Sequence, residues 1–562
     1  MDIQRYLLIA ASLLLSIMLL GEWTAFKEAN RNQADRPRLT AGTVTETTTT
    51  IEELSPVNVD ESIEQDLPDV ANLEPAQDFP VTTNHFVTVK TDALEVVINL
   101  KGGDIIETAL PAFPETIDNP DVPFVILEQN QVRTYVAQSG FVGKNGFDTP
   151  ERASYTTDNS LYTLTDNSPL DVALTLQGTN DDIHVVKTFT FHPGSYLIDV
   201  NYTISNNSDS RWEATPFAQL KRDSSLPPGA DSSGFGMQPF LGAATTTDDD
   251  RFKKFSFGDL ADESWKADQE GGWIALLQHY FLSAWVPSPD RTHKYFARQT
   301  AAGVNLAGFT SPTLTVDPGT QGHYRARLYV GPKDQYALAE ISPHLELTVD
   351  YGWLWWIAQP LFWLLTKIQS LVNNWGLAII LLTVLVKGAF FQLSAASYKS
   401  MAKMRKVQPK MQSIREQYAE DKQKQSQAMM ELYKKEKINP MGGCLPILIQ
   451  MPVFIALYWV LMESVELRQA PFALWIDDLS VMDPYFVLPL LMGASMFFMQ
   501  KLNPPPPDPM QAKIMQWLPV VFTFFFLWFP AGLVLYWVVN NLLSMAQQWV
   551  ITRRIEREGT KA

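Results

Sequence analysis

The sequence predicts a multidomain membrane protein: an N-terminal transmembrane anchor, a large all-β domain, and an α-helical module of five transmembrane helices. Three observations predict this architecture. Long apolar runs occur only at residues 6–20 and after residue 351. Between them the apolar and polar residues alternate with the period of half-buried strands. The charge divides in the same way, because residues 22–345 carry 23 Lys and Arg against 45 Asp and Glu, whereas residues 346–562 carry 20 against 15. The acidic and basic parts are therefore expected to face different compartments.

Residues 1–26 are predicted to form an uncleaved transmembrane anchor. Arg5 precedes the apolar run, and Trp23 stands where a signal-peptide cleavage site would need a small residue. Extended to Phe26, the segment reaches the roughly 20 residues that a bilayer requires. Residues 27–80 follow, rich in Thr, Glu, Asp and Pro and without apolar periodicity, and this composition predicts a disordered acidic linker.

Residues 81–345 are predicted to form a large sandwich of mostly antiparallel strands. The segments HVVKTFTF and YLIDVNYTI flank the turn HPGS and predict a hairpin, and residues 333–341 predict a short closing helix. The single cysteine, Cys444, excludes an intrachain disulfide. The histidines show no metal-ligand spacing, and no nucleophile elbow or phosphate loop is present, so we predict no metal, no cofactor and no catalytic site. A carbohydrate groove remains an alternative to a scaffolding or docking role for the sandwich.

The last third of the chain holds the membrane module, residues 374–552. Residues 351–372 are rich in Trp but contain Gln359, Pro360 and Lys367, so they predict an amphipathic helix lying along the membrane interface. The first span of the module is predicted at 374–397. Three apolar blocks follow, at residues 444–461, 485–499 and 514–550. The last block is too long for one span, and the turn signal WFPAG divides it into two, so the three blocks give the other four spans.

Loop charges predict the orientation of these spans. Residues 398–441 form a predicted helical hairpin with 11 Lys and Arg against 5 Asp and Glu, so the hairpin is expected in the cytoplasm. Residues 466–484 carry one Arg against four acidic residues and are expected outside. Both termini are then cytoplasmic, including the tail 553–562 with its three arginines, and the large domain lies outside.

Lys387 is the residue that most needs an explanation, because it lies near the middle of a predicted span. A lysine at the centre of a membrane helix costs about 2.5 to 3.5 kcal/mol. One explanation is an ion pair with Glu463. The other is a polar groove, because Thr383, Lys387 and Ser394 would share one helix face. The other polar residues predicted to line that groove are Gln450, Trp537, Asn540, Asn541, Ser544 and Gln548.

The predicted cytoplasmic hairpin begins with a strongly basic stretch. Its positive charge is typical of any cytoplasmic loop, or it attracts ribosomal RNA or anionic lipid. The residues predicted to dock cytoplasmic partners are Lys399, Lys403, Arg405, Lys406 and Lys410.

Several segments resemble one family closely. MAKMRKVQPKMQ, INPMGGCLPILIQMPVFIALY and FFFLWFPAGLVLYWVVNN are similar to the membrane module of bacterial insertases of the YidC/Oxa/Alb family, and GGWIALLQHYF and LYVGP are similar to the periplasmic β-super-sandwich of its Gram-negative type. The resemblance covers the whole chain. It implies a multi-pass protein of the bacterial inner membrane, in which Lys387 is the charge of a lipid-accessible groove and Thr383 and Trp537 meet the substrate.

The same resemblance implies what the protein works with. The expected function is a membrane protein insertase and chaperone for nascent inner-membrane proteins, acting alone or with the Sec translocon. It implies transient contact with the ribosome and targeting machinery, residence in the phospholipid bilayer, no recognition of a specific nucleic-acid sequence, no cofactor and no enzymatic reaction. Two alternatives stay open: a secondary transporter with Lys387 as its substrate or proton site, and a periplasmic sugar-binding or sugar-processing protein with a membrane anchor.

Two positions depart from the family pattern. Gram-negative relatives usually have arginine where this chain has Lys387, and tyrosine where it has Trp537. Lysine keeps the positive charge but lacks the planar fork of a guanidinium, so an electrostatic role survives and a bidentate role is in doubt.

Overall fold

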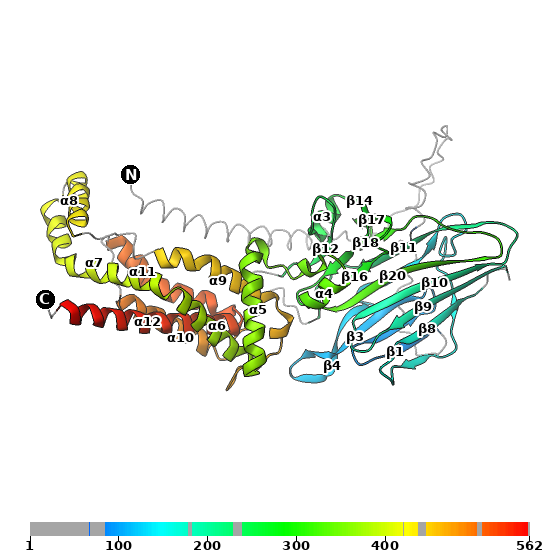
Figure 1. Cartoon of the computed structure of the whole chain (residues 1–562), viewed down its shortest axis with the longest axis horizontal. Helices are drawn as coiled ribbons and strands as arrows, with labels where there is room; N and C mark the ends of the chain where they lie inside the picture. Colours follow the sequence, from blue (N-terminus) through cyan, green and yellow to red (C-terminus); the bar gives the residue numbers. More distant parts are fainter. Residues whose placement is uncertain are drawn as a thin grey trace, which may run out of the picture. The chain divides into compact units, whose positions relative to one another are not determined.

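The computed structural model describes Leu67 and residues 85–177, 182–228, 239–419, 421–436, 445–502 and 509–559. These residues form two compact units, one made of strands and one of helices (Figure 1). The predicted anchor, 1–26, and all of the predicted linker except Leu67 lie outside the described residues.

The first sheet of the β unit has eleven strands, all paired antiparallel except β1 and β7. In spatial order they are β14 (Trp265–Glu270), β17 (Thr292–Gln299), β18 (Asn305–Thr310), β11 (Trp212–Arg222), β5 (Thr134–Val142), β4 (Asn119–Gln129), β3 (Asp104–Thr116), β2 (Glu95–Asn99), β1 (Phe86–Lys90) and β7 (Leu161–Thr163), with β19 (Leu314–Val316) beside β11.

The second sheet has nine strands. In spatial order they are β13 (Lys253–Ser256), β12 (Gly242–Thr245), β15 (Ile274–Leu277), β16 (Phe281–Val286), β20 (Thr320–Pro332), β10 (Leu197–Asn206), β9 (Ile183–Phe191), β8 (Leu170–Leu176) and β6 (Tyr155–Thr156). The predicted hairpin is confirmed, because β9 and β10 pair antiparallel with Phe191 opposite Ile198. Between β13 and β14 the short helix α3 (Phe257–Asp262) begins at a capping box formed by Ser256 and Asp259.

The two sheets pack face to face through a shared core, which confirms the predicted sandwich. Alternate residues of β10 are buried, among them Val200, Tyr202 and Ile204. The Tyr202 hydroxyl lies 3.1 Å from Ser139 Oγ of the other sheet. The buried face thus holds aromatic rings whose polar ends find partners across the sandwich, as buried tyrosines require.

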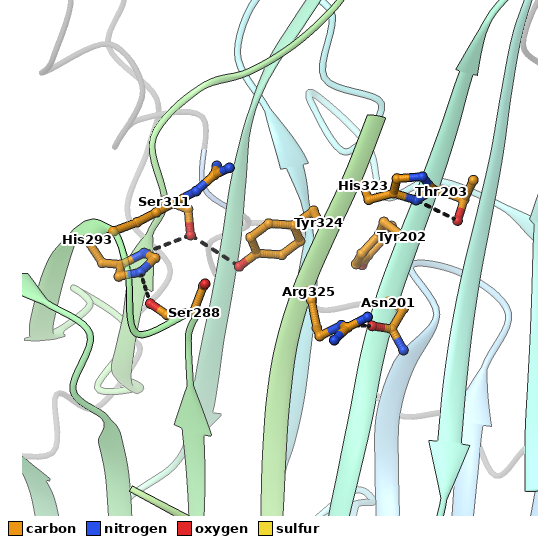
Figure 2. Close-up of a pocket in the computed structure, with 10 residues that line it drawn as sticks. Asn201, Tyr202, Thr203, Ser288, His293, Ser311, His323, Tyr324 and Arg325 are labelled. Carbon is orange, nitrogen blue, oxygen red and sulfur yellow. Dashed lines mark hydrogen bonds between the residues drawn. The ribbon is translucent and has the colours of Figure 1, made fainter. Parts of the chain in front are cut away.

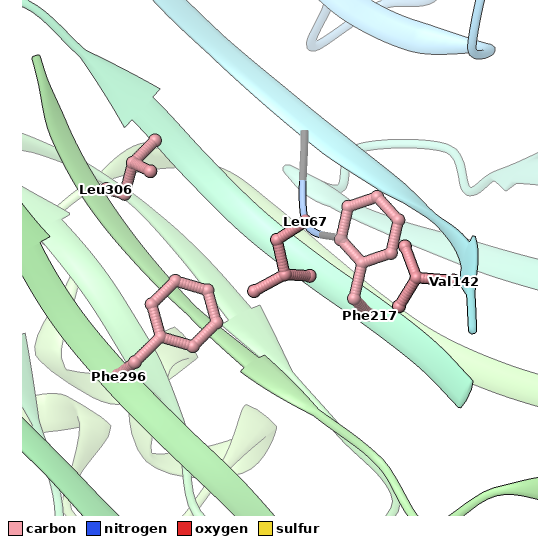
Figure 3. Close-up of a cluster of buried hydrophobic side chains, with 5 residues drawn as sticks. All are labelled: Leu67, Val142, Phe217, Phe296 and Leu306. Carbon is pink, nitrogen blue, oxygen red and sulfur yellow. The ribbon is translucent and has the colours of Figure 1, made fainter. Parts of the chain in front are cut away.

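Leu67 falls within the predicted linker, yet it is buried at 3 % exposure. It packs in a cluster with Val142, Phe217, Phe296 and Leu306 of the eleven-stranded sheet (Figure 3). Fully burying a leucine contributes about 1.5 to 3 kcal/mol. At this residue, therefore, the segment before the sandwich is attached to its core.

The helical unit begins at Pro332 and includes the predicted closing helix, which groups with the helices and not with the sandwich. Its helices are α4 (Gln335–Ile341), α5 (Trp355–Val372), α6 (Trp375–Ala389), α7 (Phe391–Gln417), α8 (Lys422–Lys435), α9 (Leu445–Glu463), α10 (Val487–Leu502), α11 (Pro509–Phe525) and α12 (Ala531–Gly559), with short 3₁₀ turns at Leu345–Thr348, Gly352–Leu354, Val465–Leu467 and Phe526–Trp528.

The segment 374–397, predicted as one helix, is broken. The Asn374 side chain caps α6 by accepting from the Leu377 N–H at 2.9 Å, but α6 ends at Ala389 and α7 continues after a bend of 66°. Gly388 weakens the helix at this point, while the apolar composition runs on past the break. Lys387 therefore lies in the last turn of α6 and not in the middle of a continuous helix.

The described helices match the predicted spans only in part. Among the described residues, no single helix has both the length and the apolar composition of a membrane span, but the bent pair Trp375–Ala389 and Phe391–Met401 does. Three shorter helical stretches are also apolar: Ile449–Glu463, Val487–Leu502 and Lys513–Trp528. The division of the last apolar block is confirmed, since α11 and α12 are separated by a turn in which the Ala531 N–H donates to the Val481 carbonyl at 2.7 Å.

Candidate functional site: a buried lysine bonded to neutral oxygens

Three helices of the helical unit bring polar side chains together around Lys387. The lysine is only 5 % exposed. Its Nζ donates to Ser544 Oγ of α12 at 2.8 Å and lies 3.4 Å from Gln450 Oε1 of α9. The predicted association of Lys387, Gln450 and Ser544 is therefore seen in the structure.

Ser544 is the centre of this cluster. Its hydroxyl donates to the Asn540 carbonyl at 2.7 Å, one turn earlier in α12, which leaves its oxygen free to accept from Lys387. The Tyr398 side chain of α7 also forms a hydrogen bond with Ser544. The sequence interpretation missed Tyr398, because the bend that turns α7 toward α12 leaves no mark in the apolar pattern.

In the part of the chain that the structure describes, no carboxylate balances the charge of Lys387. Within the described chain, Lys387 forms no ion pair, and Glu463 instead pairs with Lys333 at 3.4 Å. The alternative explanation of Lys387 as the partner of Glu463 is therefore wrong. Among the described residues, the ammonium is bonded to neutral oxygens, which accept from it without cancelling its charge.

The remaining predicted wall residues divide into two groups. Thr383 and Ser394 are buried on α6 and α7, and Thr383 Oγ1 donates to the Ile379 carbonyl at 2.6 Å. Asn541 is buried as well, but its amide donates to Ser495 Oγ of α10 at 3.0 Å. Asn541 therefore joins α12 to α10 and does not contact the lysine.

Trp537 lies in aromatic surroundings. Its ring centroid is 4.4 Å from that of Phe454 on α9, 5.1 Å from Phe526 and 6.2 Å from Phe522. The sequence interpretation placed Trp537 in the polar stripe of α12, whereas the structure places its ring against these three phenylalanines. Asn540, half-buried on the same helix, contributes its backbone carbonyl to Ser544.

The basic residues predicted to dock cytoplasmic partners lie on α7, which packs against α8 through Val407, Met411 and Leu432. Lys399 and Lys410 are exposed, and Lys410 Nζ donates to Glu436 at 2.7 Å. The side chains of Lys403, Arg405 and Lys406 lie outside the described residues.

A second cluster of ionisable residues, missed in the sequence, surrounds the C-terminal end of α9. Lys333 and Glu463 are both buried, with side chains 2 % and 6 % exposed. Three residues further along, burial and, to a smaller extent, the negative charge of Asp334 together raise the pKa of the Glu466 carboxyl to about 7. Lys333 could not be assigned to this cluster from sequence, because it is separated from Glu463 by more than a hundred residues.

Two family models match almost all of the described chain. The YidC periplasmic domain matches residues 86–364, and the 60Kd inner membrane protein family matches residues 367–558. A membrane protein insertase YidC of Pseudomonas fluorescens (strain SBW25) is 50 % identical, with both chains covered completely. The corresponding protein of Stutzerimonas stutzeri (strain A1501) is 49 % identical over 99 % of each chain.

A solved structure also aligns with the chain. It is described as an active YidC insertase with the first transmembrane domain resolved, and it is 19 % identical with a TM-score of 0.36, covering 83 % of this chain and 94 % of the other. The full-length relatives and the two family models carry the assignment: this chain belongs to the YidC family of membrane protein insertases.

Proposed function

We propose that this chain inserts nascent inner-membrane proteins into the bilayer, and that the cluster of Lys387, Ser544 and Gln450 attracts their polar segments. The observation that carries the proposal is the buried ammonium held only by neutral oxygens. An ammonium without a carboxylate partner keeps a positive potential, which is strong where the dielectric constant is low. Polar and acidic parts of a substrate are then stabilised within the membrane module, which lowers the cost of leaving water.

The proposed site is a groove with a charged part and an aromatic part. Lys387 and Thr383 line the charged part, while Trp537, with the phenylalanines around it, provides a surface for apolar side chains. The polar tail of a substrate meets the lysine while its apolar segment moves sideways into lipid. No covalent bond is made or broken in this process, so the proposed activity is not enzymatic.

The proposed topology has both termini in the cytoplasm, five membrane-spanning helices in the module and the sandwich in the periplasm. In this arrangement, helix α5 lies along the periplasmic surface of the inner membrane. Trp353, Trp355, Trp356 and Trp363 expose more than half of their surface, as expected of an aromatic belt. Phe362 and Leu365 of α5 are buried.

The proposed partners follow from this topology. Ribosomes and targeting factors reach the basic face of α7, where Lys399 and Lys410 are exposed. The Sec translocon delivers substrates laterally through the bilayer, and the chain also acts without it.

The proposal is tested by replacing Lys387 in a strain depleted of its own insertase. Lys387→Ala is expected to abolish growth and Lys387→Arg to restore it at equal expression. Lys367→Ala, which removes the same charge from an exposed position of α5, serves as the control and is expected to be neutral. Full rescue by Lys387→Ala would remove the lysine from the mechanism, and solute uptake by purified protein in vesicles would favour a transporter.

The topology is tested separately by cysteine accessibility. Cys444 is first replaced by serine, and cysteines are then introduced at Asp478 and Lys424. A membrane-impermeant reagent is expected to label the first from the periplasm and the second only in inverted vesicles. The reverse pattern would overturn the proposed orientation.

A further inference from the structure

The sandwich contains a polar pocket that is not part of the proposed insertion site. Its volume is about 410 Å³, and it lies between β10 and β20 of one sheet and β17 and the end of β18 of the other (Figure 2). This volume falls within the usual range of pockets for small molecules. The sequence interpretation left a carbohydrate groove in this domain as an open alternative, but it identified no residues for one.

The floor of the pocket is a buried chain of hydrogen-bonding groups. His293, Ser311 and Tyr324 are 1 %, 5 % and 7 % exposed. His293 Nε2 lies 2.9 Å from the Ser288 carbonyl, its Nδ1 lies 3.0 Å from Ser311 Oγ, and Ser311 Oγ lies 3.2 Å from the Tyr324 hydroxyl (Figure 2). Facing a carbonyl, which only accepts, Nε2 must carry a proton. Burial lowers the pKa of His293, so its ring is neutral and adds no charge to the floor.

The rim of the pocket carries the charge. Arg291, His323 and Arg325 are exposed. Asn201 of β10 and Arg325 of β20 lie opposite each other in the paired strands. Arg325 Nε donates to Asn201 Oδ1 at 2.9 Å, and this hydrogen bond orients the guanidinium. Arg291 lines the same pocket as the floor residues, and its positive charge opposes the rise that burial causes in the pKa of Tyr324.

The pocket is distinguished by the absence of negative charge. None of the residues that line it in the described chain is acidic, although residues 22–345 carry a net charge of −22. Two arginines and several hydroxyl groups thus line one cavity in a part of the chain whose net charge is negative. Arginine binds planar or tetrahedral oxyanions through paired N–H groups, and such charge-assisted hydrogen bonds are about twice as strong as neutral ones.

We propose that this pocket binds a small oxyanion, a phosphate or carboxylate group carried by a hydroxylated molecule. Arg291 and Arg325 hold the anionic group at the rim, and the Ser311 and Tyr324 hydroxyls bond the neutral hydroxyls of the ligand at the floor. This site would let the periplasmic domain respond to a soluble or headgroup-derived ligand independently of the membrane module.

The test uses the purified full-length chain in detergent and isothermal titration with five probes: inorganic phosphate, glucose 6-phosphate, gluconate, galactose and glycerol 3-phosphate. The anions are expected to bind and galactose is not. Gluconate against glucose 6-phosphate distinguishes a carboxylate from a phosphate, and glycerol 3-phosphate against glucose 6-phosphate distinguishes a lipid headgroup from a sugar.

Matched variants show whether binding occurs in this pocket. The double variant Arg291→Gln and Arg325→Gln is expected to bind the anions at least about tenfold more weakly, because two charge-assisted contacts are lost. Arg251→Gln, the same change at an exposed arginine outside the pocket, is expected to leave binding unchanged. Tyr324→Phe removes one floor hydroxyl and is expected to weaken glucose 6-phosphate more than inorganic phosphate.

Three outcomes would overturn the proposal. They are no saturable binding of any anion at about 10 mM, equal binding of galactose and glucose 6-phosphate, or equal loss of binding in the Arg251→Gln control. Circular dichroism of each variant establishes that it is folded. If the double arginine variant does not fold, Tyr324→Phe and the single Arg325→Gln variant provide the same comparison.

Discussion

At the scale of single residues, the described surroundings of Lys387 offer its ammonium neutral oxygens and no carboxylate. The Ser544 hydroxyl donates its proton to the Asn540 carbonyl, so toward Lys387 its oxygen acts only as a hydrogen-bond acceptor. Gln450 offers a second neutral oxygen. A carboxylate at either position would hold the lysine more tightly, but it would also neutralise the charge that a substrate is proposed to meet.

Ser544→Ala is expected to slow insertion about threefold to tenfold. The change removes the 2.8 Å hydrogen bond from Lys387, and a bond to a charged group contributes about 1.5 to 3 kcal/mol, part of which Gln450 and water recover. The measurement is the insertion rate of a client with an acidic N-terminal tail into proteoliposomes. Ser544→Thr keeps the hydroxyl and is expected to restore the rate, and Ser413→Ala, on exposed α7 surface, is the control. Equal rates for Ser544→Ala and wild type would show that the hydroxyl does not position the lysine.

Glu466 gives the protein a dependence on pH. Its folded pKa of about 7 lies above the usual 4.5, so between these values the folded state binds more protons than the unfolded state. The contribution of Glu466 to stability is therefore most favourable below this window and is lost as the pH rises through it. Glu466→Gln is expected to flatten that decline and to stabilise the protein at pH 8 by up to about 3 kcal/mol.

The check on Glu466 is the thermal unfolding temperature measured from pH 5 to pH 8. Glu340→Gln, at an exposed position of α4, is expected to retain the pH dependence of the wild type. An unchanged slope in Glu466→Gln would assign the dependence to another group.

Among the residues of the candidate site, the sequence predicted those that are unusual in their local surroundings. Lys387 stands out because a cation is costly in an apolar helix, and Ser544 and Gln450 stand out as polar residues in apolar segments. Tyr398 and Lys333 could not be predicted, since a tyrosine on a basic helix and a lysine after a strand are ordinary in their local sequence. Their roles come from contacts between distant segments.

At the scale of elements, the break between α6 and α7 is where the structure departs from the apolar pattern of the sequence. Apolar composition continues through Phe391, so periodicity alone extends the span to residue 397. The bend of 66° places Lys387 at the end of α6 and turns Ser394 and Tyr398 onto a second helix. The turn between α11 and α12 was predictable, because proline and glycine mark it in the sequence.

Close packing of α10 against α11 depends on Gly493. A Cβ at this position would overlap Thr523 Oγ1, which is fixed by its 2.7 Å hydrogen bond to the Pro519 carbonyl. Alanine gains about 1 kcal/mol of helix propensity over glycine, but overpacking costs about 1 to 3 kcal/mol. Gly493→Ala is therefore expected to lower the unfolding temperature.

The double variant tests this cause directly. Gly493→Ala combined with Thr523→Ala removes the overlapping hydroxyl and is expected to recover most of the lost stability. Thr523→Ala alone measures the cost of losing the hydroxyl. Additive effects of the two changes would show that the two positions do not interfere.

At the scale of the whole molecule, the boundary between the two units differs from the boundary that the sequence predicts. The predicted end of the sandwich, at residue 345, follows the closing helix, whereas the described structure assigns Pro332–Ile341 to the helical unit. Lys333 then pairs with Glu463, and Tyr336 stacks on Phe362 of α5 at 6.3 Å. Composition distinguishes strands from helices, but it does not show which domain a short connecting helix packs against.

This boundary predicts different outcomes for two deletions of the sandwich. Removing 85–331 leaves the helical unit intact, and we expect it to retain most of its insertase activity in a depleted strain. Removing 85–345 also takes Lys333 from the buried Glu463, and breaking a buried ion pair costs about 3 to 5 kcal/mol. The longer deletion is therefore expected to unfold at a lower temperature and to support growth less well. Lys333→Ala within the shorter deletion should reproduce much of that loss, whereas equal stability of all three proteins would show that the ion pair does not hold α4 to the module.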